Sequence, residues 1–313
     1  MILKNLEFLV GKSLPSKKGF EPFDDTVCEF LDFFSKDLFN ISKKLDRPDL
    51  ASLAFWCRKN NLIKLKEKHN QEKIAKGLGL VFHITPSNIP TNFAYSLVFG
   101  ILTGNNSVIK VPTKKFEEIK IICERINYIL KIKKFRSIKN KITIIRYNDK
   151  DNITKQISQI SDGRLIWGGD NTVKEIKSFR AKTRSIDLTF GDRYSFAVIN
   201  SESLKKLNEN QMMNLIKNFY NDTYLVDQNA CSSPHLIIWL GKANKIKNIF
   251  WQKLLEYVKE NYDHPSIASI DKLSDLYNSI ILNKEIKKIK TFDKFLYVIT
   301  LKKLHKNLDN NRG

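Results

Sequence analysis

Residues 77–112 read GLGLVFHITPSNIPTNFAYSLVFGILTGNNSVIKVP. Two short apolar runs, 79–84 and 107–111, flank a longer apolar segment, 92–102, whose length favours a helix. A strand, a helix and a second strand in this order predict a βαβ unit with parallel strands. The alternation continues, with further elements expected at 116–130, 142–146, 152–160, 164–167 and 172–179. The sequence therefore predicts an α/β fold with a Rossmann-type parallel sheet and helices on both faces.

Changes in pattern divide the chain into three parts. Residues 1–76 are expected to be mostly helical, because apolar residues recur at three- and four-residue spacing in 29–34 and 50–66. The βαβ alternation makes 77–226 the expected dinucleotide-binding domain, and 227–313 the smaller α/β catalytic domain. In this last part we expect helices at 247–261 and 265–282 and a strand at 294–301.

The residues just after each expected strand are the candidates for ligand binding, because open α/β sheets bind ligands beyond the carboxyl ends of their strands. The first strand is followed by Thr85-Pro86-Ser87-Asn88, a loop stiffened by its prolines. Lys110 ends the second strand, and Gly168-Gly169 open a helix where a diphosphate could approach the backbone. Alone, such a glycine pair is commonly plain turn chemistry and such a lysine a surface charge. Together they predict a cofactor site formed by residues that precede a candidate catalytic thiol in the chain.

That thiol is Cys231, in the polar run DQNACSSPH (227–235) directly before an apolar strand. A packing cysteine is usually ringed by apolar neighbours, whereas this one is ringed by hydrogen-bonding groups. Backbone amides, dipoles or a cation can lower the pKa of such a thiol and make it a nucleophile. The alternative is a surface-turn cysteine without a role. The other cysteines, Cys28, Cys57 and Cys123, form no CxxC pair, which indicates neither a zinc site nor a disulfide framework.

Composition and charge narrow the class of protein. The chain has 313 residues, 42% of them hydrophobic, which indicates a globular protein of two domains. No apolar run reaches the roughly 18 to 20 residues that span a bilayer, so we expect a cytoplasmic protein. The net charge of +21 comes from scattered lysines, and the clusters 131–141 and 284–290 are expected on helical or turn stretches as solvated faces. We therefore expect no nucleic-acid partner, but a field that favours polyanionic ligands such as phosphorylated cofactors, coenzyme A or an acidic carrier protein.

Together these motifs resemble the aldehyde dehydrogenase superfamily and, within it, the LuxC-type acyl-CoA reductases, over roughly residues 77–240. The resemblance implies an aldehyde-dehydrogenase-like fold in which Cys231 is the nucleophile and Asn88 is the oxyanion-hole amide. It implies that Lys110 contacts the cofactor ribose. The remaining residues that it assigns to cofactor binding are Thr85, Pro86, Ser87, Thr113, Gly168, Gly169 and Gly191.

Two departures from the superfamily pattern refine the implied activity. Thr189 stands where hydrolytic aldehyde dehydrogenases have the glutamate that activates water, so an acyl-enzyme would be protected from hydrolysis. This disfavours an aldehyde-oxidising dehydrogenase. Thr113 stands where NAD-preferring members commonly have a ribose-binding glutamate, and Lys114 and Lys115 follow it. A neutral residue beside two cations tolerates a 2′-phosphate, so NADPH is the expected cofactor.

The sequence thus predicts NADPH-dependent reduction of an acyl-CoA, or of an acyl-carrier or acyl-protein thioester, to an aldehyde. The alternative is a partial or non-catalytic relative that binds acyl groups or a partner protein. Only 82 of the 313 residues follow Cys231, which predicts a C-terminally shortened form of the fold. Homo-oligomer formation stays open, and no metal is expected. His83 is interpreted as a core residue and His235 as a hydrogen-bonded structural residue.

Overall fold

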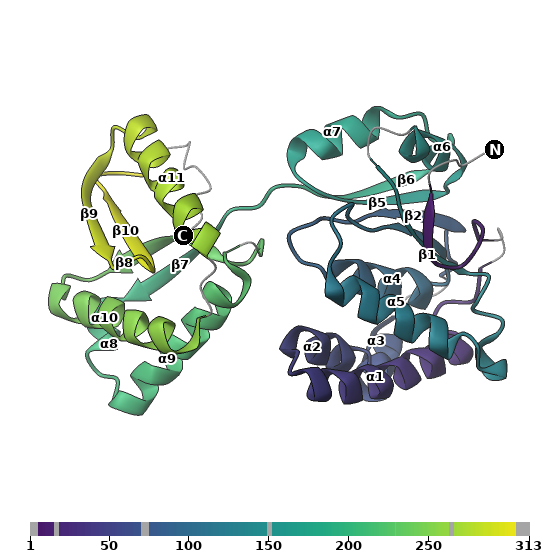
Figure 1. Ribbon diagram of the computed structural model, residues 1–313, viewed down its shortest axis with the longest axis horizontal. Helices are drawn as coiled ribbons and strands as arrows, with labels where there is room; N and C mark the ends of the chain where they lie inside the picture. The colour runs from purple at the N-terminus through teal and green to yellow at the C-terminus, as the bar shows by residue number, and fades with distance from the viewer. Residues whose placement is uncertain are drawn as a thin grey trace. The chain divides into compact units, whose positions relative to one another are not determined.

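The computed structural model describes residues 6–15, 19–69, 75–148, 152–228, 230–262 and 266–304. The chain forms two compact units, residues 1–192 and 193–313, each with its own hydrophobic core. Figure 1 shows the helices and strands of each unit. Within the described residues, no helix is both long enough and apolar enough to cross a membrane.

The first unit is built on a six-stranded sheet in the order β1-β4-β3-β2-β5-β6. The five strands β2 to β6 are parallel, and β1 joins the edge antiparallel to β4. The strands are β1 (Glu7–Val10), β2 (Leu80–Ile84), β3 (Asn106–Lys110), β4 (Ile142–Arg146), β5 (Gly163–Trp167) and β6 (Ile186–Phe190). The order reverses beside β2, since β3 and β4 extend the sheet on one side and β5 and β6 on the other. The predicted Rossmann-type parallel sheet is confirmed; strand β1 was not predicted.

Helices cover both faces of this sheet, and every residue of β2, β3 and β4 is therefore buried. In Figure 1, α4 and α5 lie on one face and α6 and α7 on the other. The three N-terminal helices lie beyond α4 and α5, in the same core. The helices are α1 (Asp25–Leu45), α2 (Pro48–Trp56), α3 (Lys59–His69), α4 (Asn92–Leu102), α5 (Glu117–Ile129), α6 (Ile153–Ile160) and α7 (Asp170–Ser178).

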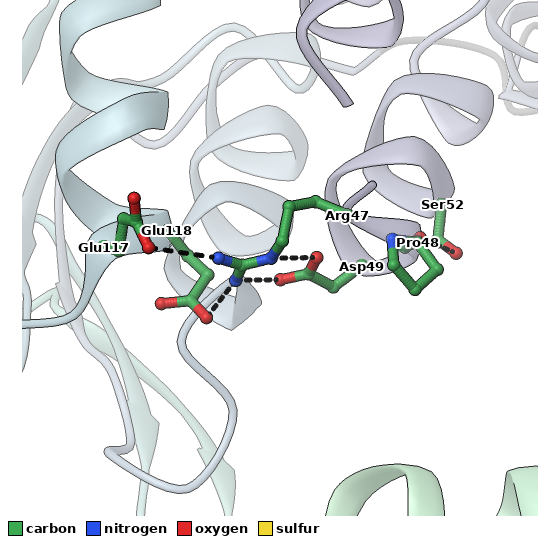
Figure 2. A network of polar contacts seen from close by, with 6 residues as sticks. All are labelled: Arg47, Pro48, Asp49, Ser52, Glu117 and Glu118. Atoms are coloured by element: carbon green, nitrogen blue, oxygen red, sulfur yellow. Dashed lines mark hydrogen bonds and ion pairs between the residues drawn. The ribbon is translucent and has the colours of Figure 1, made fainter. Parts of the chain in front are cut away.

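Arg47 ties the N-terminal helices to the sheet-covering helices (Figure 2). It precedes Pro48, the first residue of α2, and its guanidinium binds Asp49 through two hydrogen bonds of 3.2 and 3.1 Å. The same guanidinium reaches α5, where it bonds to Glu118 and, at 3.5 Å, to Glu117. Because α5 covers the sheet, this network and the shared core make the helices of 1–76 part of the first unit. The expected boundary at 76/77 is not a boundary in the structure.

The second unit contains two small two-stranded sheets with helices packed against them. Strands β7 (Ser195–Asn200) and β8 (Pro234–Leu240) pair in parallel, and β9 (Ile286–Phe292) and β10 (Leu296–Leu301) form an antiparallel hairpin. The helices are α8 (Ser201–Leu204), α9 (Glu209–Asp222), α10 (Asn244–Asn261) and α11 (Ser266–Leu282), with a 3-10 turn, η2, at Tyr224–Val226.

Two expectations about this unit differ from the structure. The lysine cluster at 284–290 was expected on a helix or turn, but most of it lies in β9, where Ile286 and Ile289 pair with Leu301 and Ile299 of β10. The expected boundary at 226/227 falls inside the unit. Residues 193–226 join the part with Cys231, since Met212, Ile216 and Tyr220 of α9 pack into the same core as α10.

Candidate active site

The carboxyl ends of β3, β2 and β5 meet at one edge of the first unit's sheet, because these parallel strands are direct neighbours. The point where the strand order reverses lies between β2 and β5. In doubly wound sheets this is where the loops diverge and where a ligand finds space. Lys110, the loop from Thr85 and the Gly168-Gly169 turn all lie at this edge, as the sequence predicted.

The loop after β2 is fastened to the neighbouring strand. The backbone N–H and the hydroxyl of Thr85 both donate to the carbonyl oxygen of Lys110, at 3.2 and 2.7 Å. Thr85 is buried, whereas Ser87 and Asn88 are exposed farther along the loop. The loop therefore has a fixed base and presents its polar side chains to solvent.

Lys110 is a buried cation at the end of β3, with 8% of its surface exposed. Its Nζ lies 5.4 Å from the centroid of the Tyr147 ring, which gives it a cation–π contact. Thr113 is exposed, and its hydroxyl donates to the carbonyl oxygen of Tyr147 at 3.4 Å. Lys114 and Lys115 next to it are exposed as well. One buried and two exposed ammonium groups thus follow the same strand, a charge pattern suited to an anionic ligand.

Two aspartates meet at the N-terminus of α7. The backbone N–H of Asp170 donates to Asp192 at 3.0 Å, and the backbone N–H of Asp192 donates back to Asp170 at 3.3 Å. Both glycine turns lie against these carboxylates: a Cβ at Gly169 would come within 3.2 Å of Asp192, and one at Gly191 within 2.6 Å of Asp170. The helix N-terminus therefore already accepts an anionic group, supplied by the chain itself. Sequence reasoning missed Asp170 and Asp192, because their pairing bridges two strands and has no local signal.

The ends of β5 and β6 carry a stacked aromatic pair. The rings of Trp167 and Phe190 lie 3.8 Å apart, centroid to centroid, at 9°. The indole N–H of Trp167 donates to the Ser96 hydroxyl at 3.3 Å, which orients the ring. Thr189 lies one residue earlier on β6, opposite Ile166 of β5. Thr189, which the family resemblance compared with the glutamate of hydrolytic aldehyde dehydrogenases, is thus a half-buried residue on a regular strand.

Cys231 lies on a tight turn of the second unit and is exposed. Its carbonyl oxygen accepts a hydrogen bond from Ser195 at 2.7 Å, and the N–H of Ser233 donates to Ala230 at 3.0 Å. Asn229, part of the predicted motif, lies outside the described residues. The turn leads directly into β8, as the sequence predicted.

The other three cysteines have the features of structural residues. Burial raises the pKa of Cys57 and of Cys123 to about 12. Cys28 is half-buried, and burial raises its pKa as well. A thiol with a raised pKa is a poor nucleophile at neutral pH. Among the four thiols, Cys231 is the exposed one and therefore the most accessible to a reagent.

An open cavity of about 1290 Å³ lies in the second unit and touches both flanks of the thiol turn. Asp227 and Gln228 line it before Cys231, and Pro234 and His235 line it after. Its walls include apolar residues of β8 and lysines of the β9–β10 hairpin, among them Lys287 and Lys288. Its volume exceeds that of a usual small-molecule pocket of about 300–1,000 Å³.

The two histidines weighed in the sequence occupy different environments. His83 is fully buried in β2, between the hydroxyls of Ser96 at 2.8 Å and Ser107 at 3.2 Å, so its assignment to the core is confirmed. Burial lowers the pKa of His83 to about 3 and keeps the ring neutral. His235 is half-buried at the start of β8, where its ring lies 5.9 Å from that of Tyr194.

Comparison with known proteins connects these features to a family. A family model described as acyl-CoA reductase (LuxC) matches residues 45–263, which include the loop after β2, the Gly168-Gly169 turn and Cys231. The chain belongs to the LuxC acyl-CoA reductase family. The family resemblance noted in the sequence is thereby confirmed.

A curated relative of this LuxC family chain is "Long-chain acyl-protein thioester reductase 2" from Photobacterium leiognathi. It is 23% identical over 188 residues, which cover 59% of this chain and 36% of the relative. The chain thus matches a little over a third of the length of that protein.

Solved structures similar to this LuxC family chain are aldehyde dehydrogenases. A putative aldehyde dehydrogenase from Burkholderia cenocepacia has a TM-score of 0.61 at 12% identity, covering 82% of this chain and 58% of that one. A betaine aldehyde dehydrogenase from Staphylococcus aureus, solved in complex with NAD+, has a TM-score of 0.56 at 15% identity, covering 87% and 59%. At these identities the likeness establishes the aldehyde-dehydrogenase-like fold, which confirms the predicted fold class.

Proposed function

We propose that this protein reduces an acyl thioester to an aldehyde through an acyl-enzyme on Cys231. The observation that carries the proposal is an exposed cysteine on a polar turn in a LuxC family chain whose other thiols are buried or half-buried. The thioester class of the substrate is supported by the name of the Photobacterium relative, which acts on acyl-proteins. Coenzyme A and an acyl-carrying protein are both candidate donors.

The first half of the reaction is transfer of the acyl group to the protein. The Cys231 thiolate attacks the thioester carbon, a new C–S bond forms to Sγ, and the C–S bond to the donor breaks. The donor sulfur leaves and takes the proton that Cys231 gave up. During attack the carbonyl oxygen becomes negative, and we propose the side-chain amide of Asn88 and the N–H of Cys231 as its hydrogen-bond donors. Removing one such donor typically lowers the rate about 10²–10³-fold.

The acyl group and the rest of the donor need separate surfaces. Apolar residues of β8 line the cavity beside the thiol turn, and the lysines of the β9–β10 hairpin line the same cavity. An acyl chain fits the first kind of surface, and phosphates or acidic side chains fit the second. This arrangement supports an amphipathic, anionic acyl donor.

The edge of the first unit's sheet fits a nicotinamide dinucleotide. Lys110 is a buried cation at a strand end, the glycine turns allow close approach, and the N-terminus of α7 already accepts a carboxylate in the position of an anion. We propose Thr85, Pro86, Ser87, Lys110, Thr113, Gly168, Gly169 and Gly191 as the residues that hold it. When bound, the reduced nicotinamide supplies the hydride that converts the thioester carbonyl to an aldehyde. NADPH is favoured because Thr113 and two exposed lysines follow Lys110, where a 2′-phosphate would meet positive charge.

The outcome of the reaction depends on keeping water from the acyl-enzyme. Thr189 has no acid–base group to activate a water molecule, so hydrolysis lacks a general base at this position. We propose that this substitution makes the protein a reductase instead of a hydrolytic dehydrogenase.

The proposed function is tested by trapping the acyl-enzyme. Incubation of the full chain with labelled acyl-CoA, and separately with an acyl-carrier protein, should give a hydroxylamine-labile adduct, and added NADPH should release aldehyde. Cys231→Ala should abolish the adduct, whereas Cys28→Ala should retain it. Thr189→Glu should release free acid. An adduct that persists in Cys231→Ala would refute the assignment, and acylation without aldehyde would favour a partial relative that only carries acyl groups.

A further inference from the structure

The residues just before Cys231 have an unusual backbone conformation. Asp227 and Gln228 both have positive φ, +49° and +52°, the left-handed region that non-glycine residues rarely adopt. Two such residues in succession persist only when surrounding contacts hold them in place. They lie four and three residues before the sulfur, so whatever holds them also sets the path of the thiol turn.

On one side, Asp227 is held by groups from other parts of the second unit. The hydroxyl of Tyr262, just after α10, donates a hydrogen bond to the Asp227 carboxylate. The ring of Tyr262 packs edge-on against Tyr224, with ring centroids 5.4 Å apart. Tyr224 itself lies in η2, directly before Asp227, and its hydroxyl donates to the carbonyl oxygen of Phe295 at 3.0 Å.

Lys272 of α11 completes this cluster. Its Nζ lies 5.1 Å from the ring centroid of Tyr224 and 5.8 Å from that of Tyr262, and it donates to the same Phe295 carbonyl at 3.1 Å. Burial lowers the pKa of Lys272, and the carboxylate of Asp227 acts in the opposite direction. The ammonium group of Lys272 is thus partly shielded from water and lies near two aromatic rings. It links α11 to η2 and to the turn between β9 and β10.

On the other side, hydrogen bonds of Gln228 and Ser195 close the turn. The side-chain amide of Gln228 donates to the carbonyl oxygen of Pro234 at 3.1 Å, and its backbone N–H donates to Thr223 at 2.9 Å. Ser195 donates to the carbonyl oxygen of Cys231 itself. The turn is therefore fixed at both ends, while its thiol stays exposed.

We infer that Asp227, Tyr262 and Lys272 are positioning residues that hold the Cys231 turn in its reactive conformation. The reactive role of Cys231 rests on the proposed function; the holding of the turn does not. The inference explains why a carboxylate and a lysine from separate segments meet at Tyr262, a residue that also packs against the core of the unit.

Amide hydrogen exchange tests the inference without any substrate. In the full chain, Tyr262→Phe and Lys272→Met should each speed exchange at the amides of Asp227, Gln228 and Ser233 by about tenfold, the factor that the net loss of one hydrogen bond produces. Tyr257→Phe and Lys253→Met are the matched controls. They alter a tyrosine and a lysine of α10 that lie outside the cluster, and should leave these amides unchanged.

Substitutions at Asp227 separate backbone freedom from the tie to Tyr262. Asp227→Gly supplies positive φ without strain but lacks the acceptor, so its turn should exchange as fast as in Tyr262→Phe. Asp227→Asn keeps an acceptor oxygen and tolerates positive φ, and should restore slow exchange. Slow exchange in Asp227→Gly, or no change in Tyr262→Phe and Lys272→Met, would overturn the inference.

Acylation of Cys231 by acyl-CoA, measured in the same variants, distinguishes the two proposals. The variants with the fastest amide exchange should have the slowest acylation. Thermal unfolding of each variant should be recorded to exclude loss of the fold. If the wild-type chain is not acylated but the exchange pattern holds, the turn is positioned and the proposed function fails. If acylation proceeds equally in wild type, Tyr262→Phe and Lys272→Met, the proposed function stands and the positioning role is refuted.

Discussion

The two units of the chain bury their strands to different extents. Every residue of β2, β3 and β4 is buried between two helical layers, whereas β7 and β8 together bury only Ile199. Phe196 and Val198 of β7 are 57% and 53% exposed. The edge that carries Lys110 and the glycine turns therefore rests on a rigid sheet, and the turn that carries Cys231 depends on individual side-chain bonds. The geometry of the sheet edge is thus determined by the fold, whereas the geometry of the thiol turn is determined by a few polar residues.

The largest expected effects come from truncating one large buried side chain in the core of each unit. Phe82 and Phe250 are both fully buried, one in each unit. Replacing either with alanine should lower the free energy of unfolding of its own unit by about 3–5 kcal/mol. Denaturant unfolding followed by hydrogen exchange in each unit should show the loss in one transition and not in the other.

The exposed Phe196 provides the control for this pair. Phe196→Ala should change stability by no more than about 0.5 kcal/mol. Equal loss of both transitions in Phe82→Ala would show that the two units unfold as one, and would contradict their description as separate compact parts.

A second comparison concerns ion pairs. Arg164, 3% exposed, binds Asp187 through two bonds of 2.7 and 2.6 Å and also donates to the carbonyl oxygens of Ile176 and Phe179. Asp187→Ala should destabilise the first unit by about 3 kcal/mol, because it leaves a buried charge without its partner. Chemical denaturation gives this value directly.

The matched pair in the second unit is Lys205 with Glu202, which is about half exposed on both sides. Lys205→Met should leave the denaturation midpoint of the second unit unchanged, because an exposed ion pair contributes little to stability. A loss in Lys205→Met as large as in Asp187→Ala would show that burial is not what makes the first pair important.

The pH dependence of stability should also differ between the units because of His83. Its pKa is about 3 in the folded protein and about 6.5 when unfolded, so the unfolded chain binds more protons between these values. The stabilising effect of the neutral ring is complete above pH 6.5 and is lost as the pH falls towards 3. Between these pH values, the free energy of unfolding of the first unit should rise by about 1.4 kcal/mol for each pH unit, and this rise is the slope to be measured. His83→Gln, measured from pH 6 to 4.5, should remove this slope; an unchanged slope would assign it to other groups.

The smallest expected effect concerns the carboxylates at the N-terminus of α7. If a dinucleotide diphosphate binds there, it meets the negative charge of Asp192. Asp192→Asn should tighten NADPH binding about fivefold, equivalent to about 1 kcal/mol for one charge near a solvated phosphate. Fluorescence titration at two salt concentrations measures this. Asp222→Asn, an exposed aspartate of the second unit, is the control and should have no effect. Weaker binding in Asp192→Asn would mean that this carboxylate organises the site instead of competing for it.

The parallel core of the fold could be predicted from the sequence, because β2 to β5 and their helices have strong local patterns of apolar residues. Strand β1 could not, since it is four residues long and its pairing with β4 is decided 130 or more residues away. In β9, the charge run at 284–290 contains Ile286 and Ile289, and their pairing with Leu301 and Ile299 is defined only by the hairpin with β10.

The candidate site divides in the same way. Lys110 ends a strand, Gly168 and Gly169 follow one, and Cys231 precedes one, so their positions follow from the order of elements. The pairing of Asp170 with Asp192, and the contacts of Asp227 with Tyr262 and Lys272, join segments far apart in the chain. No spacing rule connects them, because tertiary packing alone brings them together.

The accessibility of the thiols offers a practical route to these experiments. Since Cys57 and Cys123 are buried and Cys28 is half-buried, a maleimide dye should label the native protein at Cys231 without removal of any other cysteine. Competition between the dye and an acyl donor would then report occupancy of the sulfur by a simple change in fluorescence on a gel.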